Sequence, residues 1–322
     1  MKGDVIYLQA SFWKKLRDDT SIAGLGCLLN VYQAISEAEL RTDISDEDWN
    51  TDPYLILLWK RYLSGLSNID LYESVEIDTP IEDTEDLCAI YLTDDSETSC
   101  YELGNKYGIK VINSIDLPKK EYLFKGDGFS LTRKTQYEDR FAQFKTTISH
   151  PCNAAILIDP YILCKPINIE NNLPYLLDAI LPSKRLSIPF HFTIYSMTDE
   201  RGITNNIESV FNKVSGLFAA IRKDLKYCLT ICAISRKGDF HRRMIITNNI
   251  LFDAPDGFTV FNESGFADKN AKYDIVYPRL IRDSRQDLSE YYRWIQISYR
   301  NLHQNYNTVW GLKENRLFDL LA

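Results

Sequence analysis

The sequence predicts an α/β protein of two domains, and three observations lead to this fold class. The chain has 322 residues, which is enough for two hydrophobic cores. Short apolar runs typical of buried strands alternate with stretches of helical periodicity in both halves, as in α/β sheets. Between the halves, residues 116–143 are polar and include Gly126 and Gly128, which favours a linker. We therefore expect domains at residues 1–120 and 145–322.

In the first domain, the expected elements begin with a strand at residues 5–8. Helical periodicity follows at residues 11–17, 22–40 and 53–66, where Pro53 suits a first helical turn. A strand at 87–92, a helix ending at Lys106, and a strand at 109–112 complete the pattern, with Gly108 as a left-handed helix cap. This strand, helix, strand unit is typical of a parallel sheet.

The second domain is expected to contain a mixed or mostly antiparallel sheet flanked by helices. Expected strands lie at residues 154–158, 190–195, 227–233 and 243–247, and expected helices at 173–181, 207–223 and 288–302. The last helix carries several aromatic residues interleaved with arginines. They could form a contact surface, but their spacing favours packing in the core: Tyr291, Tyr292, Trp294 and Tyr299.

Composition and the distribution of apolar residues predict a cytoplasmic protein without a membrane span. The chain is 45% hydrophobic and 25% charged, and no apolar run approaches the length of a bilayer crossing. The first residues, Met-Lys-Gly-Asp, lack the apolar stretch of a signal peptide. The seven cysteines form no Cys-x-x-Cys pair, so we expect neither a zinc site nor a disulfide framework, and no cofactor.

The net charge of −8 is unevenly distributed along the chain. Residues 201–322 contain 18 Lys and Arg against 13 Asp and Glu, whereas residues 1–200 contain 19 against 32. A polyanion could therefore be attracted locally by the C-terminal part, although an excess of this size is also common on ordinary surfaces.

The stretch from His241 to Asn248 carries the clearest chemical pattern. It resembles the His-x-Lys and Asp signature of the phospholipase D superfamily, with Arg243 in place of the Lys and Asn248 in place of the Asp. In that superfamily the histidine attacks phosphorus, the cation neutralises the phosphoryl oxygens, and the carboxylate sets the tautomer of the histidine. Arg243 can hold a phosphate with two hydrogen bonds. Asn248 cannot stabilise an imidazolium as a carboxylate does. The pattern therefore favours phosphate binding over cleavage, with His241, Arg243 and Asn248 as the candidate catalytic set.

Further polar side chains stand near expected strand ends. Asp159 and Tyr161 follow one strand, and Asp159 could form a hydrogen bond with His241 or Arg243 or cap the following turn. His191 and Ser196 stand near the two ends of the next strand. With Arg242 and Arg243, these residues form the candidate ligand-binding set.

Residues 145–280 resemble the phospholipase-D-like domain found at the C-terminus of proteins that carry a microtubule-interacting-and-trafficking domain. The resemblance rests on Asp-Pro-Tyr-Ile from Asp159, on Ile-Tyr-Ser ending at Ser196, on His-x-Arg at 241–243 and on the Gly257-Phe258 turn. It implies a phosphodiesterase fold that lacks the catalytic pair and binds acidic headgroups or partners. Active members combine two histidines in one site, whereas this chain shows one motif.

The first domain is similar to PIN-type nuclease domains at Thr93-Asp94-Asp95 and at Gly-Ile-x-Val from Gly108. Gln9 stands where those domains carry their first metal-binding Asp. A neutral amide weakens a Mg²⁺ or Mn²⁺ site, so we expect no catalytic metal. The carboxylates near Asp95 are equally explained by the first turn of a helix.

Three functions follow as hypotheses. The first is a degenerate phospholipase-D-like subunit that binds nucleic acid or another phosphorylated ligand, within a prokaryotic antiviral defence or mobile-element assembly. The second is a metal-independent nuclease that acts through His241 across a homodimer. The third is an adaptor that binds protein partners. We expect binding rather than catalysis.

Overall fold

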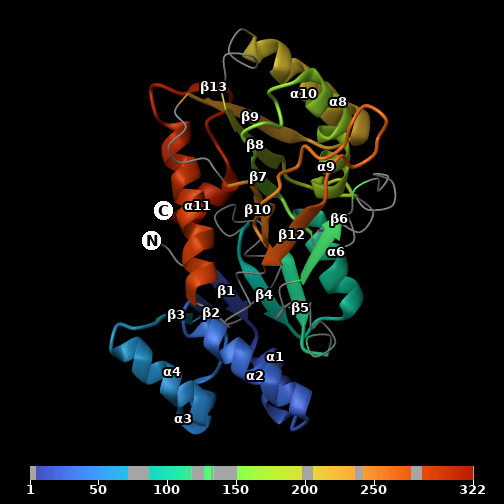
Figure 1. Ribbon diagram of the computed structural model, residues 1–322. Coiled ribbons are helices and arrows are strands. Elements are labelled where there is room, and N and C mark those ends of the chain that lie inside the picture. Colours follow the sequence, from blue (N-terminus) through green and yellow to red (C-terminus); the bar gives the residue numbers. More distant parts are fainter. Residues whose placement is uncertain are drawn as a thin grey trace.

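The computed structural model confirms the α/β class, with two sheets and helices around both (Figure 1). It describes residues 5–71, 87–115, 117, 127–131, 133, 151–197, 206–235, 242–276 and 285–321.

The N-terminal sheet is parallel throughout and has the strand order β3-β2-β1-β4-β5. Its strands are β1 (Val5–Leu8), β2 (Glu39–Thr42), β3 (Asn68–Leu71), β4 (Ile90–Thr93) and β5 (Lys110–Asn113). The helices between them are α1 (Ala10–Asp18), α2 (Ile22–Ile35), α3 (Asp46–Thr51), α4 (Pro53–Leu63) and α6 (Glu97–Tyr107).

Local sequence explains where these helices begin and end. Ser21, Ser45 and Ser96 each accept a hydrogen bond from a backbone N–H of the first helical turn. Asp52 does the same for α4, and its other oxygen accepts a hydrogen bond from the indole of Trp13 at 2.9 Å. One expectation was wrong: the helix expected over residues 22–40 ends at Ile35, and Glu39 and Leu40 belong to β2. This strand is four residues long, and its Leu40 stays in phase with the preceding helix.

The C-terminal sheet has eight strands in the order β13-β9-β8-β7-β10-β11-β12-β6. The central strands β7 (Ala154–Ile158), β8 (Phe190–Met197) and β9 (Tyr227–Ile234) are parallel. The others pair antiparallel, which makes the sheet mixed: β6 (Asp127–Leu131), β10 (Met244–Thr247), β11 (Leu251–Asp253), β12 (Ala271–Val276) and β13 (Thr308–Gly311). Strand β6 lies inside the segment expected to be a linker.

Helices cover both faces of the C-terminal sheet (Figure 1). One face packs against α9 (Leu173–Ile180) and α10 (Ile207–Ile221), with α8 (Pro166–Asn171) beside them. The opposite face packs against α11 (Arg285–Leu302) and the 3-10 helix η5 (Arg316–Leu321). Tyr291 and Trp294 of α11 are buried there, as core packing predicts, whereas Tyr299 is 44% exposed.

The two sheets contact each other through buried polar side chains. Asn153 donates to the carbonyls of Leu87 and Tyr107, at 2.7 and 2.9 Å. Asn248 donates to the carbonyl of Gly108 at 2.9 Å. Cys88, next to β4, belongs to the core beneath α11. The N-terminal sheet is therefore joined to the base of the C-terminal sheet by specific contacts.

Candidate functional site

Arg243 lies just before β10, beside the carboxyl end of the antiparallel neighbour β7. Its Nη1 donates to the carbonyl of Pro255 at 2.7 Å, and its guanidinium carbon lies 5.4 Å from the centroid of the Tyr161 ring. Among the described residues, its Nε and Nη2 groups donate to no protein atom. The guanidinium is therefore held on one side and retains donors for a ligand.

Asp159, at the end of β7, organises the backbone around Arg243. Its side chain is fully buried, and its two oxygens accept hydrogen bonds from the N–H groups of Tyr161 and Phe258, at 2.8 and 2.9 Å. Burial raises the pKa of Asp159, whereas these two bonds and the charge of Arg243 act in the opposite direction. Asp159 therefore caps its turn, as one of the two expectations has it. Both of its oxygens accept from backbone N–H groups, and the charge of Arg243 acts on it without a hydrogen bond between the two among the described residues.

Gly257 permits the close approach of this turn to Arg243. Its φ of +79° lies in the left-handed region, which glycine adopts without strain. A Cβ at this position would lie 2.5 Å from Cδ of Arg243 and 3.3 Å from Oδ2 of Asp159. The glycine therefore makes room for the arginine stem.

Ser196 is close to this site but does not face solvent. Its hydroxyl donates to the carbonyl of Pro160 at 3.1 Å, and the side chain is buried. The N–H of Met197 donates to the same carbonyl, also at 3.1 Å. Ser196 thus fastens the turn that carries Asp159 and Tyr161 and has a positioning role.

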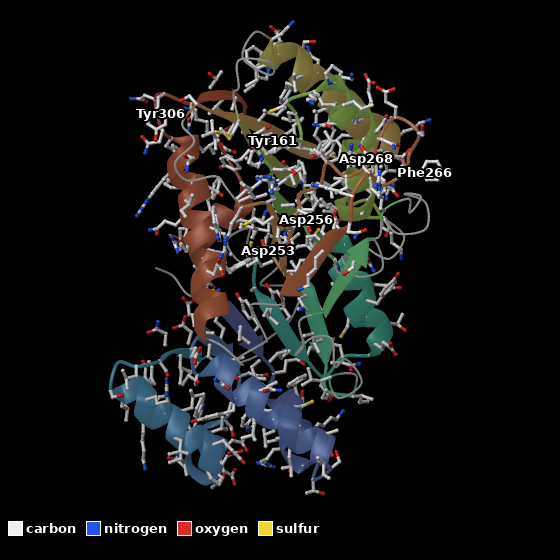
Figure 2. The ribbon with its side chains drawn as sticks, viewed as in Figure 1. Tyr161, Asp253, Asp256, Phe266, Asp268 and Tyr306 are labelled. Atoms are coloured by element: carbon white, nitrogen blue, oxygen red, sulfur yellow. The ribbon has the colours of Figure 1, made fainter. Side chains whose placement is uncertain are left out.

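A cavity of about 880 Å³ opens beside Tyr161, within the size range of small-ligand sites. Lys165 and Asn168 lie on the α8 side, and Asn262, Glu263 and Asp268 lie on the long loop between β11 and β12. Figure 2 shows Asp268 on this loop beyond Tyr161, with Phe266 further out. Sequence reasoning missed this loop, because its residues look like ordinary turn formers until the fold brings them to α8.

Two of the expected ligand-binding residues lie elsewhere. Arg242 forms an ion pair with Glu290 of α11, on the opposite face of the sheet from Arg243. His191 lies at the amino end of β8, paired with Ala154, whereas Ser196 lies near the carboxyl end. Neighbouring residues of a strand point to opposite faces, which separates Arg242 from Arg243.

Asn248 does not meet Arg243 either. It follows the far end of β10, so five residues of extended chain separate the two by roughly 16 Å. Its side chain instead accepts from the N–H of Asn153 and donates to Gly108. His241 lies outside the described residues. The structure therefore brings together Asp159, Tyr161, Ser196 and Arg243.

At the carboxyl edge of the N-terminal sheet, Gln9 and Asp94 lie where β1 and β4 end. Gln9 Oε1 accepts from the Thr93 hydroxyl at 2.6 Å and from the N–H of Asp94 at 2.8 Å. The carboxylate of Asp94 pairs with Lys15 at 2.6 Å and accepts from Ser114. Among the described residues, no three His, Cys, Asp or Glu side chains group as metal ligands.

Comparison with known proteins gives no family for this chain. No family model matches the sequence, and no curated protein matches it. None of the helices in the described part of the chain has both the length and the apolar character that a membrane crossing requires.

Proposed function

We propose that the C-terminal part of this protein binds a phosphorylated ligand, nucleic acid among the candidates, and does not cleave it. The observation that supports this most is the position of Arg243. One of its nitrogens donates to Pro255, and its guanidinium lies over Tyr161, which also lines the cavity. Its other donors bond to none of the described residues. A guanidinium fixed in this way binds a phosphate with little loss of side-chain entropy.

The surroundings of Arg243 support binding rather than acid–base chemistry. Both oxygens of Asp159 are already hydrogen-bonded to backbone N–H groups, so this carboxylate is poorly placed to take a substrate proton. Lys165 adds a second positive charge at the cavity, and Glu263 and Asp268 add acceptors. This mixture suits a phosphate that carries hydroxyl or amine groups, as a nucleotide does.

Titration with inorganic pyrophosphate and with a short 5′-phosphorylated oligonucleotide tests the proposal. Arg243→Ala should weaken both ligands by about 1.5–3 kcal/mol, the scale of a charge-assisted hydrogen bond. Arg243→Lys should have an intermediate effect, because the charge remains but the fork of donors is lost. The matched control is Arg242→Ala, which removes an arginine on the opposite face. Equal affinities for the Arg243 and Arg242 variants would contradict the proposal.

The nuclease hypothesis depends on His241 and on a supporting polar partner. Asn248 is bonded to Asn153 and Gly108 and does not supply that partner. Cleavage without divalent metal that disappears in His241→Ala would favour the nuclease and replace the proposal of binding alone.

A protein-binding adaptor is the second candidate, because one face of α2 exposes apolar side chains. Ile22, Leu25 and Leu29 are 93%, 46% and 57% exposed, at the spacing of one helical face, and α2 contains no charged residue. Sedimentation of the wild type and of Leu25→Gln/Leu29→Gln would reveal self-association through this face.

Cytoplasmic location and a role in a prokaryotic defence or mobile-element assembly belong to the same proposal. The location rests on the composition of the chain, and the role rests on the two sequence resemblances. Cell fractionation, and deletion of the gene under phage challenge, would test them.

A further inference from the structure

A row of exposed basic side chains crosses from the N-terminal part to the C-terminal part of the molecule, away from Arg243. It consists of Lys106 on α6, Lys184 and Arg185 after α9, and Lys223 and Lys226 between α10 and β9, and is called the basic strip below. Segments 182–189 and 222–226 together hold five Lys or Arg residues and one acidic residue, Asp224. The whole chain, in contrast, is acidic.

Backbone and side-chain bonds place the three segments of the basic strip side by side. The N–H of Ser187 donates to the carbonyl of Lys106, and the N–H of Phe190 donates to the carbonyl of Lys226, both at 2.8 Å. Arg222 Nε donates to the carbonyl of Pro182 at 2.9 Å, and Nη1 of the same side chain pairs with Asp178. The base of the strip is therefore fixed by the fold.

Four of the five charges of the strip are directed to solvent. Lys184, Arg185, Lys223 and Lys226 are all exposed, and none of the described carboxylates lies within ion-pair distance of them. The ammonium of Lys184 lies 4.7 Å from the centroid of the Tyr101 ring, which orients it without neutralising it.

We propose that the basic strip binds the phosphate backbone of a nucleic acid, independently of base sequence. Exposed cations on adjacent segments can contact successive backbone phosphates, and release of condensed counterions favours their contact. A membrane surface fits less well, because membrane-binding surfaces expose several large apolar side chains. In α6 and in segments 182–189 and 222–226, all of them described, Tyr101 is the one large hydrophobic side chain that is exposed. The strip lies at the amino ends of β8 and β9, whereas Arg243 lies near the carboxyl ends of the parallel strands. The inference therefore does not rest on the phosphate site.

Fluorescence anisotropy of the full chain with oligonucleotides tests this assignment. The probes are 30 nucleotides long, single-stranded or duplex, and lack terminal phosphates. Arg185→Glu/Lys226→Glu should weaken binding at least tenfold at 100 mM salt. If about two phosphate contacts are lost, the negative slope of log K against log salt concentration should become shallower by roughly 1.8 for duplex DNA. The neutral pair Arg185→Gln/Lys226→Gln should give a smaller loss in the same direction.

The matched control is Lys60→Glu/Arg293→Glu, which makes the same change in net charge at exposed positions outside the strip. Binding by the strip variant within twofold of this control would overturn the proposal, as would binding to anionic vesicles with none to oligonucleotides. Pyrophosphate is too small to span the strip. Loss of pyrophosphate binding in Arg243→Ala, with unchanged binding to the 30-residue probes, would separate the two sites.

Discussion

Both ends of the Asn248 amide are bonded, and the end that donates to Gly108 joins the two sheets. The sequence motif suggests that an Asp here would restore a catalytic set. In the structure, an Asp would keep the acceptor for Asn153 but place a carboxylate oxygen against the carbonyl of Gly108.

We expect Asn248→Asp to lower the free energy of unfolding by about 1–3 kcal/mol or more, and to create no phosphodiesterase activity. Urea denaturation and a cleavage assay measure the two effects. Asn105→Asp is the control, because its amide also donates to a carbonyl, that of Tyr101, but at an exposed position. New cleavage by Asn248→Asp would show that residue 248 belongs to a catalytic set, as the motif suggests, and would contradict the structural role.

His191 should contribute to the pH dependence of stability. Burial, and then the nearby charge of Arg316, lower the pKa of His191 to about 4, below its ordinary value of 6.5. The unfolded state therefore binds more protons between these values. Stability should be fully present above about pH 6.5 and decrease as the pH falls toward about 4.

Denaturation midpoints of the wild type and His191→Gln across this range check the expectation. The slope of unfolding free energy against pH measures the protons taken up on unfolding, and in the variant this number should be smaller by up to about one. His303→Gln, the same substitution at an exposed position, is the matched control. A wild-type slope in His191→Gln would mean that another group causes the effect.

At the scale of elements, the junction between α6 and β5 decides how closely the two sheets approach. Gly108 ends α6 with a φ of +66°, and a Cβ there would lie 2.5 Å from the carbonyl oxygen of Cys152. Gly65 follows α4 with a φ of +72°, but nothing lies within 4 Å of its added Cβ.

Both glycines should resist substitution by alanine, but to different extents. Gly65→Ala should cost about 1–2 kcal/mol for the left-handed backbone alone. Gly108→Ala should cost about 1–3 kcal/mol more, because the methyl group forces the sheets apart. Guanidinium denaturation of both variants gives the loss of unfolding free energy for each, and the difference is the contribution of the contact between the sheets. Equal losses would show that the sheets adjust to the added methyl group at little cost.

For the whole molecule, the buried contacts of Asn153, Asn248 and Cys88 link two sheets that the sequence predicts as separate domains. We expect the sheets to unfold together. Hydrogen exchange measured along a denaturant series should give β4 and β7 a common midpoint. In Asn153→Ala, which leaves two buried carbonyls without their donor, both should shift by about 2–4 kcal/mol in unfolding free energy. Separate midpoints in the wild type would indicate independent domains.

The sequence by itself determined the α/β class and most long elements, because strands such as β7 and helices such as α10 are strongly patterned over their own length. It also determined the cap at Gly108, whose left-handed conformation only glycine adopts readily. The sequence did not predict the short strands β2 and β3. Strand β1 has four residues and is an unbroken apolar run, whereas β2 and β3, of the same length, mix polar and apolar residues over too few positions to show a period.

Tertiary structure decided which polar residues meet. Arg243 and Asp159 are 84 positions apart in the sequence, and they come together because β10 pairs antiparallel with β7. The same pairing carries Asn248 to the opposite end of the strand, although the motif groups it with Arg243. A motif records order along the chain, whereas a site depends on strand direction and register, which long-range pairing fixes.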